Sequence, residues 1–172
     1  MAAAADQLFP DDLIAGAARL IDMLRARPAT IAFAESCTGG LLSALLTSIP
    51  GSSDVLGFGF VSYSNEAKTE LLGVPEPLLN RYGAVSPQVA GAMATGALER
   101  SGSSLALAVT GIAGPSGGSA LKPVGLVYIA ISRSRTETKT HELQLGDIGR
   151  ASIRLKTVEA ALKLAIDACA AL

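Results

Sequence analysis

Residues 30–46 read TIAFAESCTGGLLSALL, and this stretch indicates the fold class of the whole chain. A short, fully apolar run over residues 30–34 predicts a buried strand, and the apolar residues between 39 and 48 predict a largely buried helix. The polar turn ESCT (residues 35–38) joins them, and three of its side chains could each be a nucleophile or a helix cap. Strands that lead through short turns into helices are the units of α/β sheets.

The rest of the chain continues this alternation. Further strands are predicted over residues 55–64, 105–111, 124–132 and 137–145, and further helices over residues 11–25, 65–73, 87–101 and from 149 onward. The last two strands are expected to form a hairpin, so that one strand runs antiparallel in a mostly parallel sheet. Gly57 and Gly59 suggest a bulge or a close backbone approach. The first ten residues are expected to form a frayed tail.

The composition fits one globular domain and argues against several functional classes. The chain has 172 residues, of which 49% are hydrophobic, so a sizeable core can be buried. Because the formal net charge is −1, we expect no nucleic-acid partner and no membrane-surface partner. No apolar run approaches the roughly 18 residues of a membrane span, and residues 1–12 lack a basic start followed by an apolar core, so we expect no secretory signal. Cys37 and Cys169 are therefore expected to be reduced thiols in a cytoplasmic protein.

Zinc and histidine chemistry have little support in the sequence. One histidine, His141, and two distant cysteines do not form a zinc site of the usual kind, so we expect no metal. His141 lies in RTETKTHELQL, whose alternation predicts an edge strand and a surface or half-buried structural role. If the protein is a hydrolase, we expect its base to be a residue other than histidine.

Small polar residues gather where the predicted parallel strands end. Ser36 follows the first strand, Tyr63-Ser64-Asn65 and then Lys68 follow the second, and Thr110-Gly111 follow the third. Because ligands bind at the carboxyl ends of parallel strands, we expect a polar site at these positions.

Each of these residues also has a structural explanation. Ser36 or Thr38 could only cap the second helix, and Cys37 could be a core residue. Tyr63 could be a hydrogen-bonded core aromatic, and Lys68 could be a solvated helix residue. The residues taken one by one leave both interpretations open.

Three short functional motifs are absent. GIAGPSGGSALK (residues 111–122) lacks the Gly-Lys-Ser/Thr ending of a P-loop, and neither it nor ESCTGGLL fits the dinucleotide fingerprint. Ser36 lacks the flanking glycines of a nucleophile elbow. The GIAGPSGG segment could still present backbone N–H groups to an anion.

A series of longer motifs points to a family. AESCTGG, GSS, VSYSNEAK, LLGV, YGAVS, VTGIAGPSGG and KPVG follow one another, and their order and spacing resemble the C-terminal domain of the competence/damage-inducible protein CinA and its stand-alone relatives. The resemblance extends from about Thr30 to the end. It implies a three-layer α/β/α fold with a mixed, mostly parallel sheet, nicotinamide mononucleotide amidohydrolase activity without a cofactor, and commonly a homodimer. Because only 29 residues precede TIAFA, we expect a single domain over residues 1–172.

The resemblance also assigns roles to residues. The family's nucleophile falls on Ser36, its lysine on Lys68, and Tyr63 belongs to the same motif as that lysine. A site arginine is implied after a Gly-Asp pair; here the chain reads GDIGR (residues 146–150), two residues longer than in relatives, and we assign Arg150. The other expected substrate-binding residues are Thr38, Gly39, Gly40, Ser53, Asn65, Thr110, Gly111 and Gly114.

The expected chemistry is a serine acyl-enzyme reaction. Ser36 would attack the carboxamide, Lys68 would be the base, and Tyr63 would relay or orient the proton. N–H groups from Thr38 to Gly40 would bind the oxyanion, and Arg150 with the GIAGPSGG segment would bind the phosphate. Two other functions stay open: hydrolysis of another small amide, and binding of a nicotinamide nucleotide without catalysis.

Overall fold

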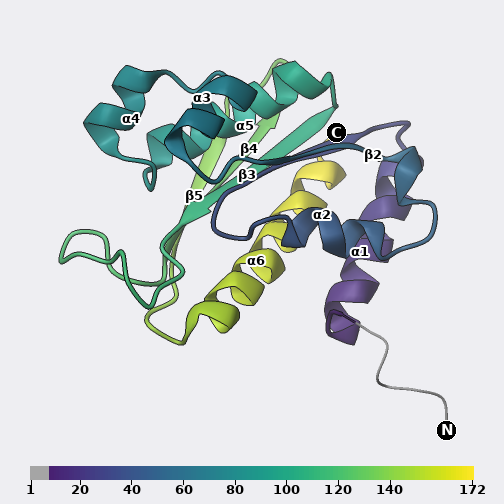
Figure 1. Cartoon of the computed structure of the whole chain (residues 1–172). Coiled ribbons are helices and arrows are strands. Elements are labelled where there is room, and N and C mark those ends of the chain that lie inside the picture. The colour runs from purple at the N-terminus through teal and green to yellow at the C-terminus, as the bar shows by residue number, and fades with distance from the viewer. Residues whose placement is uncertain (1–7) are drawn as a thin grey trace, which may run out of the picture.

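The computed structural model describes residues 8–172, in which a five-stranded sheet lies between two layers of helices (Figure 1). The strands are β1 (Ile31–Glu35), β2 (Leu56–Val61), β3 (Leu105–Gly111), β4 (Leu126–Arg133) and β5 (Lys139–Gln144). The helices are α1 (Asp11–Arg25), α2 (Leu41–Thr47), the short 3₁₀ helix η1 (Ser52–Asp54), α3 (Asn65–Leu72), α4 (Glu76–Tyr82), α5 (Pro87–Ser101) and α6 (Arg150–Ala170).

The sheet is mixed, as the sequence predicts. Its strand order is β2-β1-β3-β4-β5; β1 pairs in parallel with β2 and β3, whereas β4 is antiparallel to β3 and β5. β4 therefore runs against the other four strands, and the expected hairpin of the last two strands is confirmed. The carboxyl ends of β1, β2 and β3 meet at one end of the sheet.

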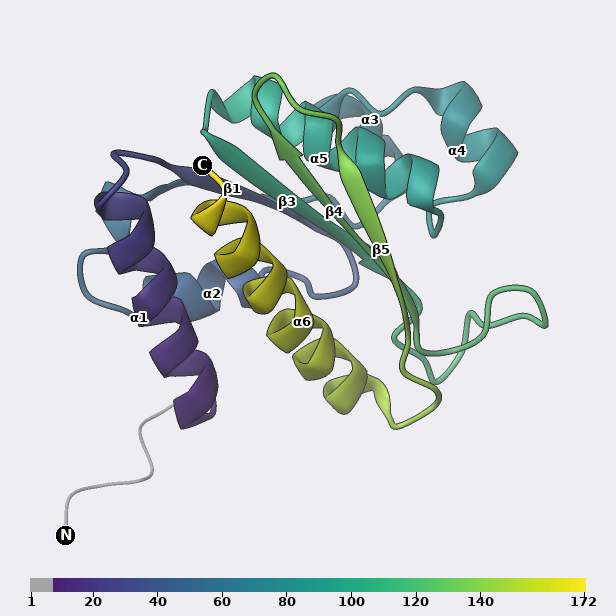
Figure 2. The ribbon, with the colours of Figure 1, turned by 180° about the vertical axis from the view of Figure 1, so that it is seen from behind.

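The two faces of the sheet carry side chains of different size. Figures 1 and 2 show α1, α2 and α6 on one face and α3, α4 and α5 on the other, which is the expected three-layer arrangement. The first face buries large residues of the strands: Ile31, Phe33, Leu105, Leu107, Val109, Ile129 and Ile131. The second face buries alanines: Ala32, Ala34, Ala106, Ala108 and Ala130. Short side chains on that face let α5 pack close to the sheet.

Local capping explains where the helices begin and end. Ser86 accepts a hydrogen bond from Val89 N at the start of α5, Pro87 takes the first helical position, and Gly102 ends the helix with a φ of 64°, all as predicted. Helix α4 was not predicted: it is seven residues long and begins after Pro75. Such a short segment gives too little periodicity to identify a helix.

The glycines of β2 have the two roles that the sequence suggests. The pairing of β2 with β1 shifts by one residue between Leu56 and Phe58, so Gly57 is the extra residue of a bulge. A β-carbon on Gly59 would lie 2.4 Å from Ser43 Oγ, which means that α2 approaches the strand closely.

The tail expected over residues 1–10 lies mostly outside the described residues. Where it can be compared with the structure, at residues 8–10, the expectation is wrong for Phe9. This residue is 4% exposed and packs in the main core beside α1.

Candidate active site

A pocket of about 200 Å³ lies at the carboxyl ends of the three parallel strands. The polar residues that follow β1, β2 and β3 in the sequence meet here, together with residues from the loop before α5 and from the start of α6. The lining residues are Ser36, Cys37, Tyr63, Lys68, Ala84, Val85, Thr110, Gly111, Ala113 and Arg150. The structure therefore brings together Ser36, Lys68, Tyr63, Thr110, Gly111 and Arg150 from the predicted set.

Ser36 and Lys68 are in direct contact. Lys68 Nζ lies 3.2 Å from Ser36 Oγ, although the two residues are 32 positions apart. The amine also donates to the carbonyl oxygens of Ser62 at 2.9 Å and Tyr63 at 3.1 Å. Among the described residues, the Ser36 hydroxyl has no other hydrogen-bond partner.

The surroundings of Lys68 favour its neutral form. The residue is only 1% exposed, and this burial lowers the pKa of its amine below the usual 10.5; a negative charge on Cys37 would oppose this effect more weakly. Cys37 itself is buried, as one interpretation of the sequence expected, and burial raises the pKa of its thiol to about 12. Cys37 is therefore a thiol, not a thiolate, near neutral pH, and the solvated position considered for Lys68 is wrong.

Glu35 caps α2, a role that the sequence analysis did not assign. The Glu35 side chain is fully buried, and its carboxylate accepts from Gly40 N, Leu42 N, Ser43 N and Ser43 Oγ at 2.8–3.0 Å. Neither Ser36 nor Thr38 caps the helix, whose N-cap residue is Gly40 with no side-chain cap of its own. The capping alternative for Ser36 is therefore wrong, because Glu35 already supplies the acceptor.

The backbone donors of the turn after β1 are only partly free. Ser36 N donates to Val109 O, Gly39 N donates to Ser36 O, and Gly40 N donates to Glu35. The expectation that Gly39 and Gly40 offer oxyanion donors is wrong for this reason. Among residues 8–172, no acceptor is bonded to the N–H groups of Cys37 and Thr38.

Arg150 reaches the pocket in spite of the two additional residues before it. Its guanidinium donates to Gly114 O at 2.7 Å and to Tyr63 Oη at 3.1 Å. This contact ties the start of α6 to the GIAGPSGG segment and to the end of β2. Gly114 thus enters the site through its carbonyl group, whereas the other N–H groups of the guanidinium stay available.

Tyr63 takes a different position from the one expected of a catalytic or core residue. Its side chain is 60% exposed, so the core interpretation is wrong. Its hydroxyl contacts Arg150, and its contact with Lys68 is made by the backbone carbonyl. The ring stands at the mouth of the pocket, which fits substrate binding better than proton relay.

Thr110 forms part of the pocket wall. It is buried at the end of β3, and its hydroxyl donates to Ala84 O at 2.9 Å. This bond joins β3 to the loop before α5. Thr38 is also fully buried, and its hydroxyl has no partner among the described residues.

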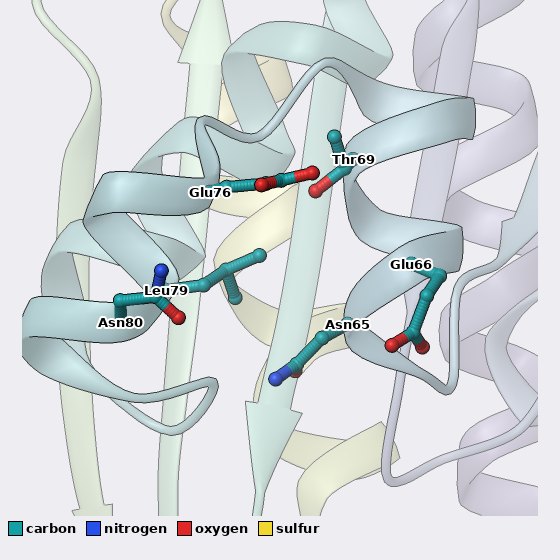
Figure 3. A pocket seen from close by; sticks show the side chains of 6 residues that line it. All are labelled: Asn65, Glu66, Thr69, Glu76, Leu79 and Asn80. Carbon is teal, nitrogen blue, oxygen red and sulfur yellow. The ribbon is translucent and has the colours of Figure 1, made fainter.

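Two predicted site residues lie elsewhere. Ser53 is exposed in η1, which precedes β2 and lies beside the amino end of β1, so it is at the opposite end of these strands from the pocket. Asn65 begins α3 and lines a neighbouring groove of about 270 Å³ (Figure 3). The groove lies between α3 and α4, and its other lining residues are Glu66, Thr69, Glu76, Leu79 and Asn80.

Other expectations concern residues away from this pocket. His141 lies half-buried on the edge strand β5, as predicted, and does not line the pocket. Within residues 8–172, no three side chains of the metal-binding types come together, and no helix has the length and apolar character needed to cross a membrane.

Comparisons with known proteins agree with this fold. Residues 14–169 match the family model described as the CinA C-terminal domain. A CinA-like protein of Akkermansia muciniphila is 53% identical over 137 residues, which cover 80% of this chain and 33% of that protein. A putative competence-damage inducible protein of Caldicellulosiruptor bescii is 51% identical over 146 residues, which cover 84% and 35%. The chain thus spans about a third of the length of these curated relatives.

Solved structures match over almost their whole length. The crystal structure of the competence/damage inducible protein CihA from Agrobacterium tumefaciens is 50% identical, with a TM-score of 0.92 and coverage of 94% of this chain and 98% of that one. A CinA superfamily protein from Escherichia coli is 32% identical, with a TM-score of 0.84 and coverage of 91% of both chains. By its sequence match and its fold, the chain belongs to the CinA C-terminal domain family.

Proposed function

We propose that this chain is a nicotinamide mononucleotide amidohydrolase that forms an acyl-enzyme on Ser36 with Lys68 as the base. The observation that carries the proposal is the 3.2 Å contact between Ser36 Oγ and the buried Lys68 Nζ inside a pocket. The substrate in the proposal comes from the resemblance of the motifs to this family.

The hydrogen bonds of Lys68 suit a neutral base. A neutral amine has two N–H donors and one lone pair; its two shortest bonds go to the carbonyls of Ser62 and Tyr63, and the carbonyl of Ser64 lies farther away, at 3.5 Å. The lone pair is then left for the proton of the Ser36 hydroxyl. Because burial lowers the pKa of Lys68, a larger fraction of the amine is neutral near pH 7 than in an exposed lysine.

The reaction would proceed in two steps. In the first, Ser36 Oγ attacks the carboxamide carbon, and the proton of the Ser36 hydroxyl passes to Lys68. The tetrahedral intermediate then collapses, and the C–N bond breaks as Lys68 gives this proton to the departing ammonia. In the second, water attacks the Ser36 ester, Lys68 again takes the proton, and nicotinate mononucleotide leaves as Ser36 regains its hydrogen. The free N–H groups of Cys37 and Thr38 would bind the oxyanion in both steps.

The size of the pocket suggests how the substrate would lie. At about 200 Å³ it is smaller than the roughly 300–1,000 Å³ typical of ligand pockets, so it would hold the pyridine carboxamide and leave the ribose phosphate at the mouth. Arg150 and Tyr63 stand there, and Arg150 uses two contacts while five N–H donors are available to a guanidinium. The phosphate would bind to the remaining donors and to backbone N–H groups of the GIAGPSGG segment.

The test is to incubate the purified protein with nicotinamide mononucleotide and to measure ammonia and nicotinate mononucleotide in equal amounts. The Ser36→Ala variant is the control for contaminating amidases. Ammonia release by the wild type and none by the variant would support the proposal. If the wild-type protein releases no ammonia from the mononucleotide but does release it from another small amide, that amide replaces the mononucleotide as the proposed substrate. A protein that binds the mononucleotide and hydrolyses nothing would have a binding role.

A further inference from the structure

Arg154 approaches the turn after β1 from outside the pocket lining. It lies one turn after Arg150 on α6, and its Nε donates to Cys37 O at 3.1 Å while one terminal nitrogen donates to Thr38 O at 2.8 Å. Within residues 8–172 it forms no ion pair with a carboxylate. Its charge is therefore directed at two backbone carbonyls of the residues that follow the proposed nucleophile.

The carbonyl of Cys37 determines where the N–H group of Thr38 points. The carbonyl of Cys37 and the N–H of Thr38 are opposite ends of one planar trans peptide group, so they point in opposite directions. By holding the carbonyl, Arg154 fixes the direction of the Thr38 N–H. This N–H and that of Cys37 are the two in the turn without an acceptor among the described residues.

The fit around Arg154 is close. A β-carbon on Gly39, whose φ is 61°, would lie 3.4 Å from the terminal nitrogen of Arg154, which is van der Waals contact distance. The side chain of Arg154 is half-buried, and a charge-assisted bond is stronger in such surroundings than in open solvent.

We propose that Arg154 is a positioning residue that orients and polarises the Cys37–Thr38 peptide group, whose free Thr38 N–H binds the oxyanion formed at Ser36. The inference rests on the proposed function, because it needs a reaction at Ser36. It does not depend on the identity of the amide. A guanidinium at the carbonyl end draws electrons through the peptide and makes the N–H a better donor, as cooperative hydrogen bonds do.

The alternative is that Arg154 only ties α6 to the rest of the protein. The chain offers a matched control for this, because Arg133 also donates to two backbone carbonyls, those of Ala168 and Ala171, at the other end of α6. Arg133 does not line the Ser36 pocket. Arg133→Ala therefore removes the same kind of contact without touching the turn.

The experiment measures how fast a fluorophosphonate probe labels Ser36. In this reaction Ser36 Oγ attacks phosphorus, the P–F bond breaks, fluoride leaves and Lys68 takes the proton, so the rate reports the nucleophile and the oxyanion donors without the natural substrate. We expect Arg154→Ala to be labelled at least about tenfold more slowly, since loss of a whole oxyanion donor costs on the order of 100-fold or more. Arg133→Ala should be labelled at the wild-type rate. Ammonia release should show a fall in kcat with little change in KM.

Three further measurements separate positioning from folding. Millimolar guanidinium ion should partly restore the labelling of Arg154→Ala, whereas the same concentration of sodium chloride should not. Arg154→Lys should recover only part of the rate, because an ammonium lacks the planar fork that reaches both carbonyls. Melting temperatures of all variants identify any that are unfolded at the assay temperature, and Arg154→Lys then carries the comparison.

The outcomes distinguish this inference from the proposed function. Equal labelling of wild type and folded Arg154→Ala would overturn the inference alone, as would a loss that Arg133→Ala reproduces. Rapid labelling of the wild type without release of ammonia from nicotinamide mononucleotide would overturn the proposed substrate and leave the inference standing. A wild-type Ser36 that the probe does not label would overturn both.

Discussion

Replacing Lys68 with methionine tests the proposed base with little change in packing. Methionine keeps an unbranched, flexible side chain of similar volume at a position that is 1% exposed. The loss of the amine leaves the carbonyls of Ser62 and Tyr63 without these donors, which costs about 1–3 kcal/mol for a buried group. Removing an amine that burial disfavours acts in the opposite direction. We therefore expect the two effects to offset one another in part, so that the free energy of unfolding falls by less than the about 2–6 kcal/mol that two unpaired carbonyls would cost alone.

The expected loss of activity is large. A positioned general base contributes about 100-fold to 10,000-fold to a rate, which corresponds to about 2.7–5.4 kcal/mol of the activation barrier. Lys68→Met should therefore release ammonia from nicotinamide mononucleotide at no more than about a hundredth of the wild-type rate. Lys68→Arg should fail equally, because arginine does not give up its proton. Thermal melting and ammonia release on the same preparations separate the two effects.

A double variant tests whether Ser36 and Lys68 act as one unit. If they do, Ser36→Ala with Lys68→Met should be little worse than either single change, because groups in one catalytic unit are strongly non-additive. Cys37→Ala provides the control for the turn, and its effect on activity should be mild. A folded Lys68→Met protein that keeps more than a tenth of the wild-type rate would refute the role of Lys68 as base. If the fold-loss of activity in the double variant equals the product of the two single fold-losses, Ser36 and Lys68 do not act as one catalytic unit.

Three further predictions concern pH, phosphate and the turn. The rate should rise with pH through the lowered pKa of Lys68, with its midpoint below pH 10.5, and the free energy of unfolding should also rise with pH because the unfolded chain binds this proton more tightly. A rate that does not change between pH 6 and about pH 10 would contradict a neutral lysine base. Arg150→Ala should raise KM for the mononucleotide and leave hydrolysis of nicotinamide riboside nearly unchanged, whereas equal losses on both would place Arg150 outside phosphate binding. Glu35→Gln should lower the free energy of unfolding by about 2–4 kcal/mol, because the amide nitrogen of glutamine cannot accept two of the four hydrogen bonds that the carboxylate accepts. Chemical denaturation measures this change, and an unchanged denaturation midpoint would argue against Glu35 as the cap of α2.

Local signals in the sequence were sufficient to predict most of the fold. The bounds of α1 follow from helical spacing, and those of α5 follow from the helix-start residues Ser86 and Pro87 and the helix-end residue Gly102. The strands follow from short apolar runs. Gly57 and Gly59 could be interpreted because a glycine in a strand has few other uses. Helix α4 was missed because seven residues carry too little pattern.

The pocket was predictable to the extent that it depends on strand ends. Ser36 and Lys68 follow parallel strands and Thr110 lies at the end of one, and parallel strands place their ends side by side. The prediction for Ser53 is wrong because this residue belongs to a turn at the opposite end of the sheet. The order of motifs along the sequence does not indicate at which end of the sheet a residue lies. The exposure of Tyr63 depends on how α6 approaches the end of β2, and residue type alone does not determine it.

The turn after β1 shows why the cap interpretation of Ser36 could be decided only with the structure. A serine in this position normally caps the helix because its oxygen is the nearest acceptor for the free N–H groups. Here the carboxylate of Glu35 takes that role, and Arg154, which is 117 positions from Cys37, takes the carbonyls. The bonds of Glu35 span at most eight residues of the sequence, whereas the bond from Arg154 to Cys37 forms only when α6 packs against the turn. With the helix end and the carbonyls both bonded to other groups, the Ser36 hydroxyl is free to meet Lys68, and the turn contributes N–H groups instead of a cap.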